Sequence, residues 1–237
     1  EKMAIYRDRP TPQVDNFLGG PPSRAGRYGD AYVIPLGGKE TWLGDAGSYF
    51  TARTPTPGTG IIGHAAPTTF DETKPYLLLY NGGQNRIYPQ FLRLHETAAS
   101  VGGVITQFTV AVDQGNRYSS AGTALTTQNV NMDSVNATGA TGYVGAVVAT
   151  AASASRRVLD HIVFRGTIDI IQDVYEIVFG GGQGAGIGGS RVATVEDFSR
   201  YSVPVVIGPG QSFLVHQWVA AQSTGPTFQV TLGYVER

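Results

Sequence analysis

The sequence predicts an all-β protein, and three features of its composition support that class. The 237 residues include 32 glycines and 13 prolines, which suit turns and extended loops and are poor residues for helix interiors. Valine and threonine, which fit strands, are abundant, whereas the helix-favouring residues lysine, glutamate and leucine are sparse. Hydrophobic residues make up 41% of the chain, which is enough to build a core. We therefore expect strands joined by turns.

Residues 1–75 show little hydrophobic periodicity. Single or paired aromatic and apolar side chains alternate there with turn residues. Because disordered tails are depleted in aromatic residues, we expect an extended N-terminal arm that becomes ordered on another surface. A set of self-packed loops is the alternative. The residues of this arm expected to contact neighbouring subunits are Tyr6, Phe17, Leu18, Tyr28, Trp42, Tyr49 and Phe50.

From residue 75 onward the pattern changes to strands. Segment 75–81 is a short apolar run that ends at Asn-Gly-Gly, a strong turn signal. Segment 103–115 places apolar and β-branched residues at every second position, which predicts a strand with one buried face. Further strands are expected at 86–96, 143–151, 156–166 and 167–180.

The last part of the chain closes the predicted fold. Segment 192–202 is expected to form a turn or two of helix, which Pro204 ends. Strands are expected at 203–207, 212–221 and 227–237. Eight or nine short strands without a long helix or an internal repeat predict a sandwich or barrel. We favour a jelly-roll-like β-sandwich of residues 76–237, preceded by the arm of residues 1–75.

A glycine loop raises the question of nucleotide binding. Residues 179–191 read FGGGQGAGIGGSR and contain G-x-G-x-x-G at Gly184, Gly186 and Gly189. In a dinucleotide-binding fold these glycines follow a strand, open a helix and precede an acidic residue by about 20 positions. Here the strand is present, but neither the helix nor the acidic residue is. We interpret the loop as a long connection between strands at one end of the sandwich.

Charge and residue usage exclude several classes of function. The chain carries 17 basic and 18 acidic residues without a block of like charge, so we expect no direct contact with nucleic acid. The absence of cysteine excludes disulfides, thiolate zinc sites and cysteine nucleophiles. No apolar run approaches the ~20 residues of a membrane span, and the first ten residues lack a signal-peptide core. A soluble protein made in the cytoplasm, with no membrane partner, is expected.

No set of residues in the sequence defines a catalytic, cofactor or metal site. His216 shares a strand face with Leu214 and Trp218, so we expect a packed or rim histidine rather than a metal ligand. No G-x-S-x-G nucleophile elbow is present. We interpret four acids as solvent-facing strand residues, with a glycosidase carboxylate pair as the alternative: Asp160, Asp169, Asp173 and Glu176. A carbohydrate-binding β-sandwich that uses exposed Tyr and Trp side chains is a further alternative.

Two segments resemble virion structural proteins of tailed bacteriophages: NRYSSAGTALTTQNVN at 116–131 and IGPGQSFLVHQWVAAQSTGPTFQVTLGYVER at 207–237. The resemblance covers about residues 85–237 and is strongest to jelly-roll decoration, or cement, proteins. It implies a homotrimer on the capsid surface of a virion, in contact with a major capsid protein and without catalytic residues. A single jelly-roll capsid protein and a head-fibre or tail adaptor are the alternatives within the same group.

Overall fold

The computed structural model describes residues 24–25, 31–32, 39–64, 69–98, 106–152, 155–165, 173–180, 197–218 and 227–237. The chain divides into two compact units, Glu1–Trp42 and Leu43–Arg237. In the first unit, β1 (Arg24–Ala25) pairs antiparallel with β2 (Ala31–Tyr32). Helix α1 (Lys39–Asp45) begins in the first unit and ends in the second.

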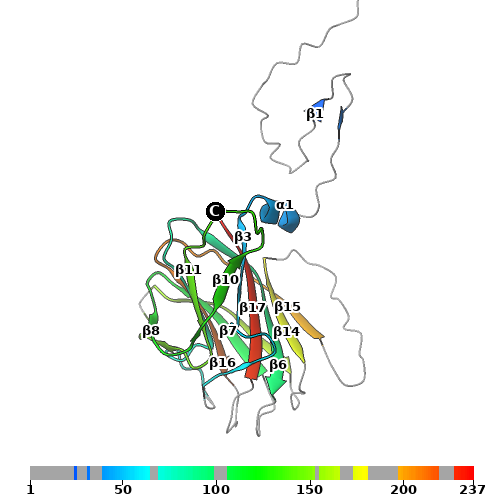
Figure 1. Ribbon diagram of the computed structural model, residues 1–237. Coiled ribbons are helices and arrows are strands. Elements are labelled where there is room, and N and C mark those ends of the chain that lie inside the picture. The colour runs from blue at the N-terminus through cyan, green and yellow to red at the C-terminus, as the bar shows by residue number, and fades with distance from the viewer. Residues whose placement is uncertain are drawn as a thin grey trace, which may run out of the picture. The chain divides into compact units, whose positions relative to one another are not determined.

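Eight main strands of the second unit form two sheets, four strands in each (Figure 1). One sheet has the order β3-β17-β6-β14 and the other has the order β13-β7-β16-β5. In chain order the eight strands are β3 (Tyr49–Arg53), β5 (Leu77–Asn81), β6 (Ile87–Ala98), β7 (Thr106–Asp113), β13 (Arg157–Arg165), β14 (Val174–Phe179), β16 (Ser212–Trp218) and β17 (Thr227–Glu236).

The pairing of these strands is that of a jelly roll, in which a long hairpin is wrapped into two facing sheets. The first strand pairs with the eighth and the second with the seventh. The third pairs with the sixth and the fourth with the fifth. All four pairs are antiparallel. The predicted fold class, an all-β jelly-roll-like sandwich, is therefore confirmed.

The sandwich begins earlier in the chain than the sequence pattern indicates. The predicted arm of residues 1–75 includes β3, which is the first strand of the jelly roll and lies between β17 and an added strand. Ala52 of this strand is completely buried. Its five residues show no clear alternation of apolar and polar side chains, so the sequence pattern does not reveal the strand. The position of β3 is set by its pairing with β17, the last strand of the sandwich. The predicted boundary at residue 75 was wrong, and the compact body starts at Leu43.

Aromatic side chains from both sheets meet in the core. Phe108 and Phe164 come from one sheet, and Tyr175 and Phe228 come from the other. The ring centroids of Phe164 and Tyr175 lie 5.3 Å apart, and those of Tyr175 and Phe228 lie 5.9 Å apart, both edge to face. Such pairs contribute roughly 0.5–1.5 kcal/mol each beyond the burial of their area. The cluster therefore ties the two sheets together.

The connection between β7 and β13 adds strands to one side of both sheets. From it, β10 pairs with β3 and β11 pairs with β5, so the same side of the sandwich is extended in each layer. The small strand β4 (Ile61–Ile62) also pairs with β17. The strands that this connection supplies are β8 (Tyr118–Ser120), β9 (Thr123–Ala124), β10 (Thr126–Asn129), β11 (Ala140–Val144) and β12 (Val148–Ala149).

A further strand, β15 (Asp197–Ser202), lies parallel to β14 at the opposite side. The expected helix over 192–202 was therefore wrong for the residues from Asp197 onward. Pairing along the whole of β14 outweighs the weak local preference for a helix, because tertiary context overrides propensity. Adjacent parallel strands need a connection of a dozen or more residues, and the glycine loop belongs to that connection. Gly184, Gly186 and Gly189 themselves lie outside the described residues.

Candidate functional site

The two sides of the sandwich differ in how their edges end. On one side β10 and β11 lie against each other and extend both sheets. On the other side β13 ends one sheet and β15 ends the other, and these two strands lie close together. Within the described part of the chain, no further strand pairs with either of them. We call β13, β15 and the following residues 203–206 the open edge.

The open edge exposes apolar side chains. Five large hydrophobic residues there are each between 42 and 49% exposed: Val158, Val163, Tyr201, Val203 and Val206. Single exposed apolar residues are ordinary, but several on neighbouring edge strands mark a surface that other molecules contact. An edge strand also presents unpaired backbone N–H and C=O groups that pair readily with another chain. The open edge therefore has the properties of an interface.

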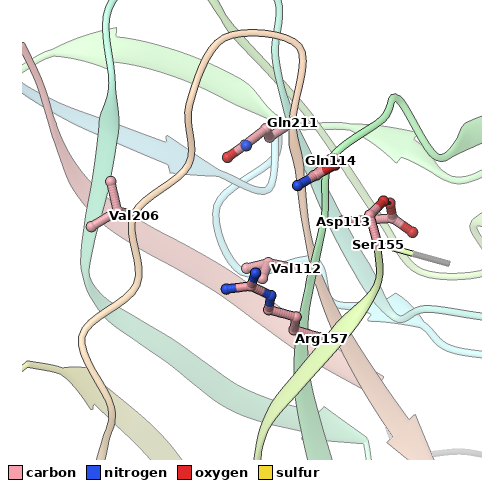
Figure 2. A pocket seen from close by; sticks show the side chains of 7 residues that line it. All are labelled: Val112, Asp113, Gln114, Ser155, Arg157, Val206 and Gln211. Carbon is pink, nitrogen blue, oxygen red and sulfur yellow. The ribbon is translucent and has the colours of Figure 1, made fainter. Parts of the chain in front are cut away.

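A pocket of about 250 Å³ lies at one end of the open edge (Figure 2). Val206 stands on one side of this pocket, and Val112 and Arg157 stand on the other. The Arg157 side chain is exposed. The complete lining is Val112, Asp113, Gln114, Ser155, Arg157, Val206 and Gln211. The two valines and the exposed Arg157 in this otherwise polar lining suit an apolar side chain that has a carboxylate beside it.

A buried ion pair supports the pocket from within. Arg117 Nη1 donates to Asp113 Oδ2 at 2.8 Å, and both side chains are at most 3% exposed. Ser155 Oγ donates to the other carboxylate oxygen of Asp113 at 3.0 Å, and Arg117 Nε donates to the Thr150 carbonyl at 2.8 Å. Loss of one partner would leave a buried charge unpaired, at a cost of about 3–5 kcal/mol. The pair also joins Thr150 and Ser155 to the end of β7.

His216 lies on the outer face of the second sheet and is buried, as expected of a packed histidine. Its Nε2 lies 3.3 Å from the Glu72 carbonyl oxygen, and its ring contacts that of Phe70. Burial lowers the pKa of His216 to about 4, and the nearby Arg117 and Arg156 guanidinium groups also lower it. The imidazole is therefore neutral at neutral pH.

A second histidine, His161, lies on the same outer face and contacts Thr109 and Trp218. Trp218 Nε1 donates to Thr109 Oγ1 at 3.0 Å, and the Thr109 hydroxyl lies 3.1 Å from His161 Nδ1. The His161 and Trp218 rings stack with their centroids 5.3 Å apart. In the described part of the chain, no group of three or more His, Asp or Glu side chains is placed to hold a metal ion.

Two carboxylates lie inside the sandwich. Asp173 is fully buried, so its expected solvent-facing position was wrong. The Tyr175 hydroxyl lies 3.4 Å from Asp173 Oδ2 and 3.4 Å from Glu96 Oε2, and Glu96 is also fully buried. Sequence reasoning missed Glu96, although it follows Leu92 and Leu94 on the inward face of β6 at period two. Neither carboxylate lines the pocket at the open edge.

The other acids that the sequence singled out occupy different surroundings. Glu176 Oε1 accepts a hydrogen bond from Arg93 Nη2 at 2.9 Å on the outer face of the first sheet. Asp160 is partly exposed on β13, and Asp169 lies outside the described residues. The three described acids, Asp160, Asp173 and Glu176, are thus not brought together into one group.

The residues predicted to contact neighbouring subunits fall into three groups. Tyr49 packs against Leu43 and Val235, and Phe50 stacks on Tyr234, so both are buried in the sandwich of their own chain. Burial leaves neither side chain available to a neighbour, and for these two the prediction was wrong. Trp42 is 46% exposed. Tyr6, Phe17, Leu18 and Tyr28 lie outside the described residues.

Comparisons with family models, with curated proteins and with solved structures return no match. The class of the protein therefore rests on its own topology, which for the described residues is that of a single jelly-roll sandwich. No helix among the described residues is long and apolar enough to cross a membrane.

Proposed function

We propose that this protein is a non-enzymatic structural protein of a virion, a capsid decoration or cement protein that acts through contacts between subunits. The open edge is the observation that carries the proposal. A protein that works as an isolated domain is expected to cover both sides of its sandwich, because uncovered strand edges pair indiscriminately. Among the described residues, β10 and β11 extend the two sheets on one side, whereas β13 and β15 end them on the other side, where five large apolar side chains are exposed on these strands or directly after them.

The resemblance of residues 116–131 and 207–237 to virion proteins supports the proposed location in a virion. The two segments supply β10 and the two C-terminal strands β16 and β17, which are parts of both sheets. On this proposal the partners are further copies of the chain, as a homotrimer, and a major capsid protein. The N-terminal segment, now limited to residues 1–42, supplies an additional attachment.

Repeated modest contacts are enough for such a role. A specific interface buries about 800 Å² on each partner, and several such contacts on one particle multiply through their high effective concentration. On this proposal, the exposed apolar side chains of the open edge and the N-terminal segment provide more than one contact for each subunit. Decoration by many copies therefore does not require tight binding at any single contact.

Quantitative mass spectrometry of purified phage particles from cells that express the chain tests this proposal. We expect a copy number that scales with the number of major capsid subunits. One or a few copies per particle would instead favour the head-fibre or tail adaptor. Absence of the chain from the particles would overturn a virion role altogether.

A further inference from the structure

The loop between β10 and β11, residues 130–139, exposes two large apolar side chains. Met132 and Val135 are each 97% exposed, and Val130 at the start of the loop is 47% exposed. This degree of exposure is far above that of the hydrophobic residues on the open edge. Side chains of this kind are costly to leave in water, so their position on a well-supported loop calls for a function.

Hydrogen bonds hold this loop in one conformation. Asn129 Nδ2 and Asn136 Nδ2 both donate to the Gly47 carbonyl, at 3.0 and 3.1 Å, and Asn131 Nδ2 donates to the Asp45 carbonyl at 3.0 Å. Within the loop, the backbone N–H groups of Asn131 and Asp133 donate to the side chains of Asn129 and Asn131. The exposed apolar pair therefore stands on a fixed support, which lowers the entropy that binding would cost.

The loop and the pocket at the open edge lie on opposite sides of the sandwich but at the same end. A row of cross-strand partners leads from the loop across the first sheet: Asn129, Phe50, Tyr234 and Pro89. Two residues before Pro89 on β6, Ile87 bridges to Ile207, the neighbour of Val206. The loop and Val206 therefore lie at nearly the same height along the strands.

The two surfaces also complement each other in charge. The loop carries Asp133, which is exposed, and residues 126–139 contain neither lysine nor arginine. The pocket carries the exposed Arg157 beside Val112 and Val206 (Figure 2). Asp113 in the lining is buried and paired with Arg117, so Arg157 is the exposed charge of the pocket, and the acidic loop with its apolar side chains complements it on the other side of an identical molecule.

We propose that copies of this chain assemble head to tail, with Met132 and Val135 of one copy seated over the pocket of the next and Asp133 beside the next copy's Arg157. A contact between two different surfaces builds a closed ring when the rotation between copies closes and an open filament when it does not. Because both surfaces lie at nearly the same height along the strands, successive copies need little rise along an axis parallel to the strands, which is the condition for a ring rather than a filament once the rotation divides a full turn evenly. The inference deepens the proposed function by naming the partner of the open edge.

Paired cysteines in the full chain test the geometry, since the native sequence contains none. The double variant Asp133→Cys/Arg157→Cys should form a ladder of disulfide-linked species on a non-reducing gel that stops at one ring size. The single variants should stay unlinked alone and give linked dimers only when mixed. Dimers formed by Asp133→Cys alone would show a symmetric contact and overturn the head-to-tail arrangement.

Charge reversal provides a second test by sedimentation velocity of the full chain. Asp133→Arg and Arg157→Asp should each raise the apparent dissociation constant of the ring by about tenfold or more, and their combination should restore it. Met132→Asp should dissociate the ring, whereas Val148→Asp, at an exposed valine on β12 outside both surfaces, should not. A native chain that sediments as a monomer at tens of micromolar would overturn the inference.

These results are separable from the test of the proposed function. A chain that is abundant in particles but monomeric in solution and unlinked by the cysteines would refute the ring and leave decoration standing. A chain that forms the ring but is absent from particles would refute decoration and leave the ring standing.

Discussion

At the scale of single residues, the outer face of the second sheet holds more ionisable groups than the sequence pattern suggests. Glu72 and Arg156 form an ion pair there, and Arg117 also approaches the Glu72 carbonyl with its Nη2. His216 lies beneath this group and contacts the same carbonyl. A neutral imidazole fits between the two arginines, whereas an imidazolium would be repelled by both.

The pH dependence of stability should report this environment. The pKa of His216 is about 4 in the folded chain and 6.5 without perturbation. Between these values the unfolded chain binds a proton that the folded chain does not, so the free energy of unfolding falls as the pH falls. The loss should reach about 3 kcal/mol near pH 4.

Urea unfolding at pH 7 and pH 4.5 measures this loss. His216→Gln keeps a donor for the Glu72 carbonyl and removes the titration, so the difference in stability between the two pH values should shrink in the variant. Equal differences in the native chain and in His216→Gln would contradict the assignment.

Gly139 offers a second test at this scale. A Cβ atom there would lie 2.4 Å from Gly83 Cα and 2.7 Å from Gly83 N, and neither backbone atom can move aside cheaply. Gly139→Ala should therefore destabilise the fold by about 1–3 kcal/mol, as overpacking does. Gly115→Ala, where a Cβ would meet nothing within 4 Å, is the matched control and should change stability by less than about 0.5 kcal/mol. Equal melting temperatures for the two variants would contradict the close approach.

At the scale of elements, sequence reasoning succeeded where a strand carries its own alternation. The inward residues Tyr175, Ile177 and Phe179 of β14 and the regular pattern of β7 were visible in the sequence. It failed for β3 and β15, whose positions depend on partners far along the chain or across a long connection. The open edge was not predicted either, because Val158 and Val163 look like any strand residues until the end of the sheet is known.

Truncation should separate the arm from the sandwich. Deletion of residues 1–38 leaves α1 and β3 intact and should preserve the far-ultraviolet circular dichroism and the cooperative unfolding of the body. Deletion of residues 1–55 removes β3 and leaves β10 and β17 without their shared neighbour. That chain should not fold cooperatively. A stable, cooperatively folding chain after the longer deletion would show that β3 is dispensable.

At the scale of the whole molecule, two kinds of contact are assigned to different parts of the chain. The head-to-tail contact uses only surfaces of the body, from the loop of residues 130–139 to the open edge. The N-terminal segment, because of its aromatic residues, is expected to contact a neighbouring subunit or the shell. The sequence alone did not indicate that these two contacts use different parts of the chain. The assignment depends on which strands end the two sheets, and that is known only from the fold.

The shorter truncation therefore also tests the division of contacts. The chain without residues 1–38 should sediment as the same ring as the full chain but should bind particles less, as measured by co-sedimentation with particles that lack the protein. Unchanged attachment would show that the arm is not needed for it. A lost ring would show that the arm, rather than the loop, joins the copies.

The pairing of the first strand with the last has a consequence for biosynthesis. While the chain grows on the ribosome, β3 emerges before the other strands of the sandwich, and its partner β17 emerges after all of them. Such distant pairings fold slowly and leave apolar strands exposed to aggregation while they wait. The sheet that contains β3 is not complete until β17 has been translated, so an interrupted chain lacks the central strand that β3 and β6 share. We therefore expect a chain that ends before β17 to fold incompletely and not to assemble with other copies.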